Sequence, residues 1–210
     1  MHSMNKYNLP RGYLSFSSWK LWKTSKEQFR KKYYHDQGHD LITPEILFGK
    51  SFAKQLENKE KTLEQVMLCS HPEYPMVVDF KGITLKGFID CFDPETLQII
   101  EYKTGHALWN RALVQKHKQL DFYCLMTFLK FGKYNPNVFL QWLPTEVTLA
   151  KKTGMIRTHK KIKLTGEVKT FKRKIYKWEI EKLKKDILLV AKEISADYTK
   201  FLNEFSKSKV

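Results

Sequence analysis

The chain has 210 residues, and its 42% hydrophobic and 14% aromatic content excludes a disordered polypeptide, because enough apolar surface is present to form a core. No apolar run is long enough to span a bilayer and no apolar signal segment follows Met1, so we expect a cytoplasmic protein without membrane contact. The 38 Lys and Arg residues against 22 Asp and Glu residues give a net charge of +16, which favours a polyanionic partner; a solvated basic surface is the alternative.

Helical signals come first along the chain. Residues 15–34 carry aromatic residues at helical spacing behind a serine cap, which is Ser17 or Ser18. A second helix is expected over 43–57, because its first residues supply a threonine cap, a proline and an acid near the positive end of the helix. A short helical piece follows at 62–68.

From Met76 the pattern changes to that of strands. Three runs rich in β-branched and aromatic residues, at 76–80, 83–92 and 97–105, are separated by short turn sequences. They predict a three-stranded antiparallel meander. A helix from 106 to 131 follows the third strand.

The second half of the chain adds strands and a long helix. A buried strand at 137–143 is ended by Pro144, and two short strands are expected near 161–164 and 168–176. The last segment is an amphipathic helix that packs on the core or, as the lesser alternative, joins two copies in a homo-oligomer. Its apolar residues recur at steps of three and four: Ile180, Leu183, Ile187, Val190, Ile194, Tyr198, Phe201 and Phe205.

Strands and helices follow one another without an internal repeat or a low-complexity linker. We therefore expect a single domain over residues 1–210, with a core at about 14–143 and basic strands and a C-terminal helix at 144–210. The predicted fold class is α/β, with a mixed central β-sheet flanked by helices.

The three cysteines, Cys69, Cys91 and Cys124, are an odd number and include no CxxC pair. A structural zinc ion or an iron–sulfur cluster needs about four close-set ligands, so neither is expected. Reduced thiols fit this pattern best.

Charged residues gather where the second and third predicted strands end. Glu101 and Lys103 share a face of one strand, because alternate residues point the same way, and the preceding hairpin brings Asp90 beside Glu101. Two adjacent carboxylates repel each other, and a divalent cation relieves this repulsion. Oxygen ligands suit Mg²⁺ or Mn²⁺, and the backbone carbonyl of Tyr102 could complete the coordination.

This arrangement provides what hydrolysis of a phosphodiester bond needs. The cation would neutralise charge on the phosphate and lower the pKa of an attacking water, and Lys103 would orient that water or stabilise the developing charge. Taken alone, however, Asp90, Glu101 and Lys103 are better explained as a surface ion-pair cluster, since exposed charges are common.

Short motifs around these residues resemble those of the PD-(D/E)XK nucleases, and most nearly the RecB-like and phage-type exonuclease group. GFID at 87–90 followed by IIEYKTG at 99–105 is similar to the family's G-x-x-D strand and its apolar-[DE]-x-K strand. The serine-rich aromatic helix start at 14–34 and the Q-x-x-x-Y pattern at 119–123 are similar to two further family motifs. Each motif is short, but four in the family's order are fairly specific, and together they touch most of 14–143.

The resemblance implies a restriction-endonuclease-like core and a metal-dependent deoxyribonuclease, with exonuclease action favoured over site-specific cutting. Such an enzyme would serve recombination, repair or phage DNA processing in the cytoplasm of a bacterial or phage-infected cell. Asp90 and Glu101 would hold the metal and Lys103 would assist the water. Gln119 and Tyr123 would position the DNA backbone.

One position departs from the family pattern. Family members usually carry a metal-ligating histidine in a G-x-x-x-H helix before the strands, whereas residues 48–57 place Ala53 there. Glu57, one helical turn further on, or Glu45, two turns earlier, could replace it as a metal ligand. The alternative is a nuclease fold that binds nucleic acid without cutting it. The lack of a cysteine cluster argues against the iron–sulfur branch of the family.

Two groups of residues are expected to contact DNA. On the helix after the lysine strand, Gln115 and Arg111 continue the face that Gln119 and Tyr123 begin, and such a polar row suits contacts to phosphates. Basic residues are also concentrated between 151 and 177, where acids are nearly absent, which argues for binding more than a diffuse charge would; a solvated hairpin is the alternative. The members of this patch that we expect at DNA are Lys172, Arg173 and Lys174.

Overall fold

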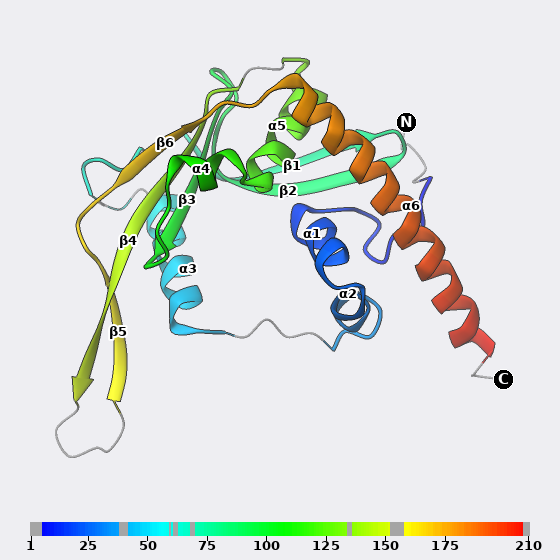
Figure 1. Ribbon diagram of the computed structural model, residues 1–210, viewed down its shortest axis with the longest axis horizontal. Helices are drawn as coiled ribbons and strands as arrows, with labels where there is room; N and C mark the ends of the chain where they lie inside the picture. The colour runs from blue at the N-terminus through cyan, green and yellow to red at the C-terminus, as the bar shows by residue number, and fades with distance from the viewer. Residues whose placement is uncertain are drawn as a thin grey trace.

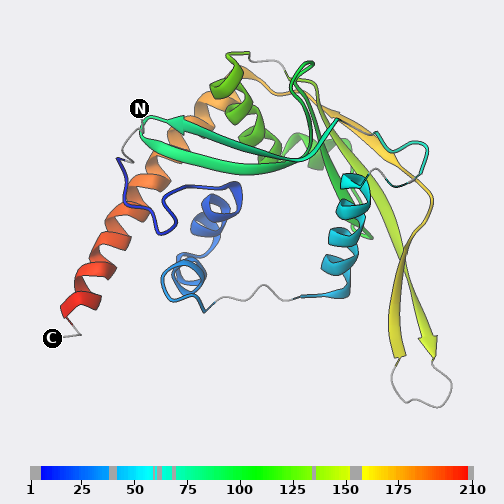
Figure 2. The ribbon, with the colours of Figure 1, turned by 180° about the vertical axis from the view of Figure 1, so that it is seen from behind.

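The computed structural model describes residues 6–37, 42–58, 60, 63–67, 70–133, 136–151 and 158–207, apart from the side chains of 149–151 and 158–160. A sheet crosses the molecule and helices lie beside it (Figures 1 and 2). The helices are α1 (Phe16–Thr24), α2 (Lys26–Tyr33), α3 (Pro44–Glu57), α4 (Arg111–Gln115), α5 (Lys118–Phe131) and α6 (Lys177–Lys207). The strands are β1 (His71–Phe80), β2 (Ile83–Asp93), β3 (Gln98–Gly105), β4 (Val138–Lys151), β5 (Thr158–Leu164) and β6 (Lys169–Arg173). None of the described helices is long and apolar enough to cross a membrane.

The sheet has six strands in the order β1-β2-β3-β4-β5, and β6 pairs with β4. β3 and β4 are parallel, while the other strand pairs of the described chain are antiparallel. Helices α3 and α5 pack against these strands. The predicted α/β class with a mixed sheet is therefore confirmed, as is the antiparallel meander of β1, β2 and β3. The meander starts earlier than expected, because β1 begins at His71 rather than Met76.

The prediction that Pro144 ends a strand is wrong. β4 continues through Pro144 to Lys151 and changes partners there, from β6 at 138–142 to β5 at 145–151. Proline cannot donate a ladder hydrogen bond, so it is tolerated where one partner strand ends and the next begins. The resulting β4–β5 hairpin extends away from the rest of the molecule (Figures 1 and 2).

The helix predicted over 15–34 is divided in two. Ser25 has an extended backbone (φ −159°, ψ 101°), which ends α1, and its side chain then caps α2 by accepting a hydrogen bond from the N–H of Gln28. Serine competes with helix continuation in this way because its hydroxyl bonds to nearby backbone groups. The cap of α1 is Ser15, which lies before the two serines that the sequence suggested.

The helix predicted over 106–131 also begins late and contains a break. His117, whose backbone is extended (φ −78°, ψ 96°), separates the short α4 from α5. Arg111 and Gln115 consequently lie on a different helix from Gln119. The single polar row proposed from the sequence does not exist.

Two smaller expectations are only partly covered by the described residues. Residues 63–67 form a turn rather than the short helix expected at 62–68. Cys124 is a buried free thiol, whereas Cys91 is disulfide-bonded, so the expectation of reduced thiols is wrong for Cys91. Cys69 lies outside the described residues.

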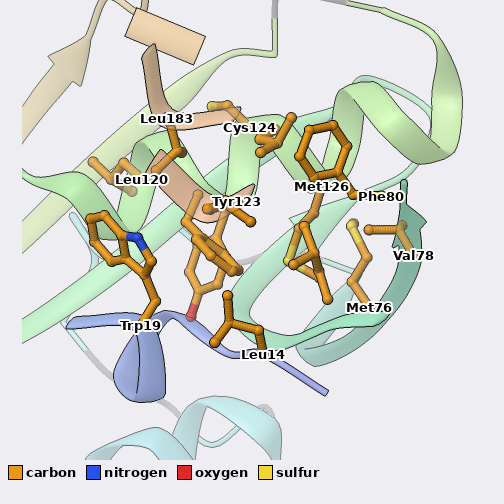
Figure 3. Close-up of a cluster of buried hydrophobic side chains, with 14 of the residues drawn as sticks. Leu14, Trp19, Met76, Val78, Phe80, Leu120, Tyr123, Cys124, Met126 and Leu183 are labelled. Atoms are coloured by element: carbon orange, nitrogen blue, oxygen red, sulfur yellow. The ribbon is translucent and has the colours of Figure 1, made fainter. Parts of the chain in front are cut away.

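One hydrophobic core joins the N-terminal segment, the meander, α5 and α6, and Figure 3 shows side chains from all of them meeting. α5 comes very close to β2, because a Cβ added at Gly87 would lie 3.2 Å from the ring of Tyr123. A side chain at this position would require the ring of Tyr123 to shift by a few tenths of an ångström. α6 buries its apolar face in the same core, including Leu183 and Ile187, which confirms the predicted packing of the terminal helix.

The expectation that Arg173 contacts DNA is wrong, because this residue is buried, with 3% of its surface exposed. Its guanidinium donates hydrogen bonds to Asp121 at 2.9 Å, to Glu179 at 2.8 Å and to the side-chain oxygen of Gln115 at 2.6 Å. These contacts tie β6 to α4, α5 and α6, and they also direct Gln115 toward Arg173. The exposed neighbours that remain candidates for DNA contact are Lys172 and Lys174.

Arg173→Met should lower the free energy of unfolding by about 3–5 kcal/mol, because Asp121 and Glu179 would lose the buried guanidinium that they share, leaving Asp121 with Lys118 alone as its ion-pair partner. Lys172→Met, one position away on the exposed face of the same strand, should change it by less than about 0.5 kcal/mol. Urea denaturation followed by circular dichroism measures both variants. Equal stabilities of the two variants would show that the arginine does not tie these elements together.

Candidate active site

The charged residues of β2 and β3 meet in a cavity of about 460 Å³, a volume typical of ligand sites. Asp90 comes from β2, while Glu101 and Lys103 come from one face of β3. α3 forms another wall, and its Gly49 lies so near β3 that an added Cβ would be 3.2 Å from Thr104 Oγ1. The three residues predicted to be catalytic are thus brought together.

Glu101 is buried in the wall of this cavity, with 1% of its surface exposed. Its Oε1 accepts a hydrogen bond from the Lys103 ammonium, and its Oε2 is buried without a hydrogen-bond partner. Burial, and then the nearby Asp90 carboxylate, raises the pKa of Glu101 to about 8 against the opposing effect of Lys103. An unsatisfied buried carboxylate oxygen is unfavourable unless a cation or a donor reaches it.

Asp90 and Lys103 complete this arrangement of charges. Asp90 Oδ2 accepts a hydrogen bond from the backbone N–H of Tyr102 at 2.9 Å, which holds the carboxylate beside β3. Burial raises the pKa of Asp90 above its usual range, although Lys103 and the Tyr102 N–H oppose the shift. Burial would lower the pKa of Lys103, but the two acids outweigh it and raise that pKa, so the lysine remains charged.

The oxygen donors of this cavity fit a hard divalent cation. As the side chains stand, no three His, Cys, Asp or Glu residues of the described chain converge to hold a metal ion. The unpartnered Oε2 of Glu101 and the carboxylate of Asp90 are nevertheless the ligand type that Mg²⁺ and Mn²⁺ prefer. These two residues would therefore hold the cation, and coordination by the Tyr102 carbonyl stays a prediction.

α3 supplies no ligand at the position where the resembling nucleases carry histidine, because Ala53 lines the cavity with a methyl group. The two substitutes expected from the sequence are placed differently. Glu45 lines the cavity from the first turn of α3. Glu57 is exposed at the other end of the helix, outside the set of described residues that line the cavity.

Sequence reasoning missed Glu73, which also lines the cavity. Its side chain is half-buried, and its pKa is raised, first by that burial and then by the negative charges of Asp90 and Glu57. It was missed because the strand pattern was taken to begin at Met76, which left Glu73 in a connection. A strand beginning at His71 would have placed Glu73 in register beside Asp90.

Gln119 lies beside Lys103 and is held there by Tyr123. Lys103 Nζ donates to Gln119 Oε1 at 3.4 Å, and Gln119 Nε2 donates to the Tyr123 hydroxyl at 2.9 Å. That hydroxyl donates in turn to the Phe88 carbonyl at 2.6 Å, and the tyrosine is buried. Gln119 is therefore available at the cavity, whereas the hydroxyl of Tyr123 is engaged in positioning Gln119.

A second cavity of about 750 Å³ adjoins the first, since Lys103 and Gln119 line both. His117 lines it with a buried Nδ1 that has no partner, and its pKa is lowered to about 4 by burial and then by Lys103 and Lys20. None of the described residues that line this second cavity carries a carboxylate. The aromatic and basic residues of this wall are Phe16, Trp19, Trp109, Lys20, Lys23, Lys103, Lys116 and Lys118.

A search of curated proteins finds no match to the chain. Among solved structures, the crystal structure of a protein from Eubacterium rectale described as a "Putative exonuclease" matches with a TM-score of 0.56 and 11% sequence identity. The match covers 88% of this chain and 83% of that one. A likeness at this identity shows a shared fold.

The sequence also matches a protein family over most of its length. The matched residues, 17–202, include the strands that carry Asp90, Glu101 and Lys103. They also extend well beyond residue 143, where the resemblance of short motifs stops. The family is the PD-(D/E)XK nuclease superfamily, and this chain belongs to it.

Proposed function

We propose that this nuclease is a Mg²⁺- or Mn²⁺-dependent deoxyribonuclease of the RecB-like, phage-type exonuclease group. The observation that carries the proposal is the Glu101 carboxylate, which is buried beside Asp90 with Lys103 at one oxygen and no partner at the other. Burying two adjacent acids is unfavourable unless a cation joins them. The enzyme would act in recombination, repair or phage DNA processing, in the cytoplasm of a bacterial or phage-infected cell.

When bound, the cation supplies positive charge to the scissile phosphate and acidifies the attacking water. Lys103, held by Glu101 and Gln119, donates hydrogen bonds where negative charge develops during hydrolysis. Gln119 positions a backbone phosphate, a contact that carries no sequence information. Cleavage independent of base sequence suits an exonuclease better than a site-specific enzyme.

DNA as the substrate, and action from an end, have further support. The net charge of +16 suits a polyphosphate partner. The chain shares its fold with the protein described as a "Putative exonuclease", and at 11% identity this likeness extends to the fold alone. We also propose that residues 1–210 act as one domain, because a single hydrophobic cluster includes both Leu9 and Ile194.

A second candidate is a nuclease fold that binds nucleic acid without cutting it. Ala53, at the position where the resembling nucleases carry a histidine ligand, favours this alternative. Such a protein would bind DNA equally well in a chelator and would not cleave DNA with any metal ion.

The decisive experiment is a cleavage assay on end-labelled linear single- and double-stranded DNA and on closed-circular DNA, with Mg²⁺, Mn²⁺ or EDTA. Metal-dependent loss of linear DNA with sparing of circles supports the exonuclease. Nicking of circles would replace it with an endonuclease. Binding without cleavage in any metal would support the inactive alternative.

Lys103→Met should lower the cleavage rate by about 100-fold or more, because one donor to the developing charge is lost. DNA affinity in EDTA should change little, since the other contacts to the strand remain. Lys185→Met, an exposed lysine of α6, serves as the matched control and should cleave at the wild-type rate. Undiminished cleavage by Lys103→Met would remove this lysine from the site.

The second cavity suits an unpaired nucleotide next to the scissile phosphate. Trp109 and the edge-on His117 ring, with centroids 5.1 Å apart, provide an aromatic surface, and lysines surround it. Stacking on aromatic rings combined with a basic groove is how proteins bind single strands without sequence preference.

Trp109→Ala should therefore weaken binding of a single-stranded oligodeoxynucleotide by roughly tenfold or more. Trp178→Ala removes a tryptophan that is 64% exposed on α6 and lies outside the described wall of this cavity, so its affinity should stay at the wild-type value. Fluorescence anisotropy in EDTA measures both. Equal affinities of the two variants would exclude the cavity as a nucleotide site.

The raised pKa of Glu101 predicts how stability depends on pH in EDTA. The unfolded carboxyl titrates near the model value of 4.5 and the folded one near about 8. Between these values the folded state binds more protons, so stability falls as pH rises, by on the order of 1 kcal/mol per pH unit. Glu101→Gln cannot titrate. The thermal midpoint of this variant should therefore rise relative to that of the wild type as the pH increases from 5 to 8. A difference between the two midpoints that stays constant over this range would contradict the prediction.

A further inference from the structure

Glu73 occupies a special position in the pairing of β1 with β2. Its neighbours Pro72 and Tyr74 pair with Cys91 and Ile89, so the residue across from Glu73 is Asp90. Two carboxylates thus face each other on adjacent strands. Like charges placed directly opposite destabilise a strand pair.

The backbone at Glu73 is also strained. Its backbone φ of 47° lies in the left-handed region, which residues other than Gly, Asn and Asp rarely adopt. The register of β1 with β2 is nevertheless the same on both sides of Glu73, so its side chain lies on the face of the sheet that carries Asp90 and Glu101 and reaches the cavity that they line. Strained positions of this kind cluster where a site requires them.

Negatively charged side chains outnumber positively charged ones around the cavity, which favours binding of a cation. Four acids line the cavity, Glu45, Glu73, Asp90 and Glu101, whereas Lys103 contributes one positive charge. Lys50 also lines the cavity but is exposed to solvent. The excess negative charge matches a divalent ion, and Glu101 Oε2 is buried with no partner of its own.

We infer that Glu73 is the third carboxylate that holds the divalent cation, in place of the histidine that Ala53 replaces. The three side chains do not converge as they stand, so this role requires them to turn toward the ion when it binds. Opposed carboxylates and a left-handed glutamate are both unfavourable by themselves, and a shared cation explains why they occur together. Glu45 reaches the same cavity from α3, and Glu57 lies near Glu73 at the end of that helix. Glu73 differs from both because the sheet itself sets it opposite Asp90. The inference rests on the proposed metal-dependent function.

The test is Mn²⁺ binding measured by isothermal titration calorimetry on the full chain, without DNA. Glu73→Gln should weaken Mn²⁺ binding about tenfold or more. Glu57→Gln and Glu45→Gln are matched controls that each remove one charge near the cavity without removing the proposed ligand, and both should weaken Mn²⁺ binding far less than Glu73→Gln does.

Thermal unfolding in EDTA adds a readout that a structural role would move the other way. Glu73→Gln should raise the midpoint, because the repulsion from Asp90 is removed, and Glu73→Gly should raise it further by also relieving the left-handed backbone. Added Mn²⁺ should then stabilise both variants less than the wild type.

The outcomes separate the inference from the proposal beneath it. Wild-type protein that binds no Mn²⁺ would overturn the metal-dependent function together with this inference. Wild-type binding that Glu73→Gln retains would overturn only the role of Glu73. A loss in Glu45→Gln or Glu57→Gln, with Glu73→Gln unaffected, would overturn it as well and assign the third ligand to α3.

Discussion

The structure depends on the burial of one carboxylate, that of Glu101 on β3. An acidic group with 1% of its surface exposed depends on its neighbours, and here the Lys103 ammonium donates a hydrogen bond to one of its oxygens. The backbone of the same strand holds Asp90 next to it through the N–H of Tyr102. The pairing of β3 with its neighbouring strands fixes the position of each of these groups, so the site forms only when the sheet forms.

A relay of hydrogen bonds extends this construction to the helices. Lys103 contacts Gln119, which contacts Tyr123, whose hydroxyl returns to the backbone of β2 at Phe88. The relay closes because Gly87 lets α5 approach β2 within contact distance. A side chain at Gly87 of the GFID motif would therefore press on the tyrosine that holds Gln119.

Much of this was accessible from the sequence. Alternation along a strand is a local property, so the shared face of Glu101 and Lys103 could be predicted, and the short connection after Asp90 set that residue beside them. The terminal helix was predictable for the same reason, since its apolar residues recur at helical spacing over many turns. The fold class followed from the order of these elements.

The failures involve residues whose surroundings come from distant parts of the chain. Arg173 sits in a basic run, and nothing local shows that Asp121 and Glu179 will enclose it. Pro144 stops an isolated strand, but not one that exchanges partners at that residue. Glu73 was missed because it lies between Pro72 and Pro75, ahead of the β-branched run at which the strand was taken to begin.

The place of α6 in the core has a consequence for the site on the sheet. Ile187 and Ile194 are fully buried in the core that supports the sheet, and Glu179 balances the buried Arg173. Removing α6 would expose the apolar surface that these residues cover and would take away one of the carboxylates that surround the guanidinium. The strands that carry the acids therefore depend on α6 for their packing, although α6 contributes none of the described residues that line the cavity.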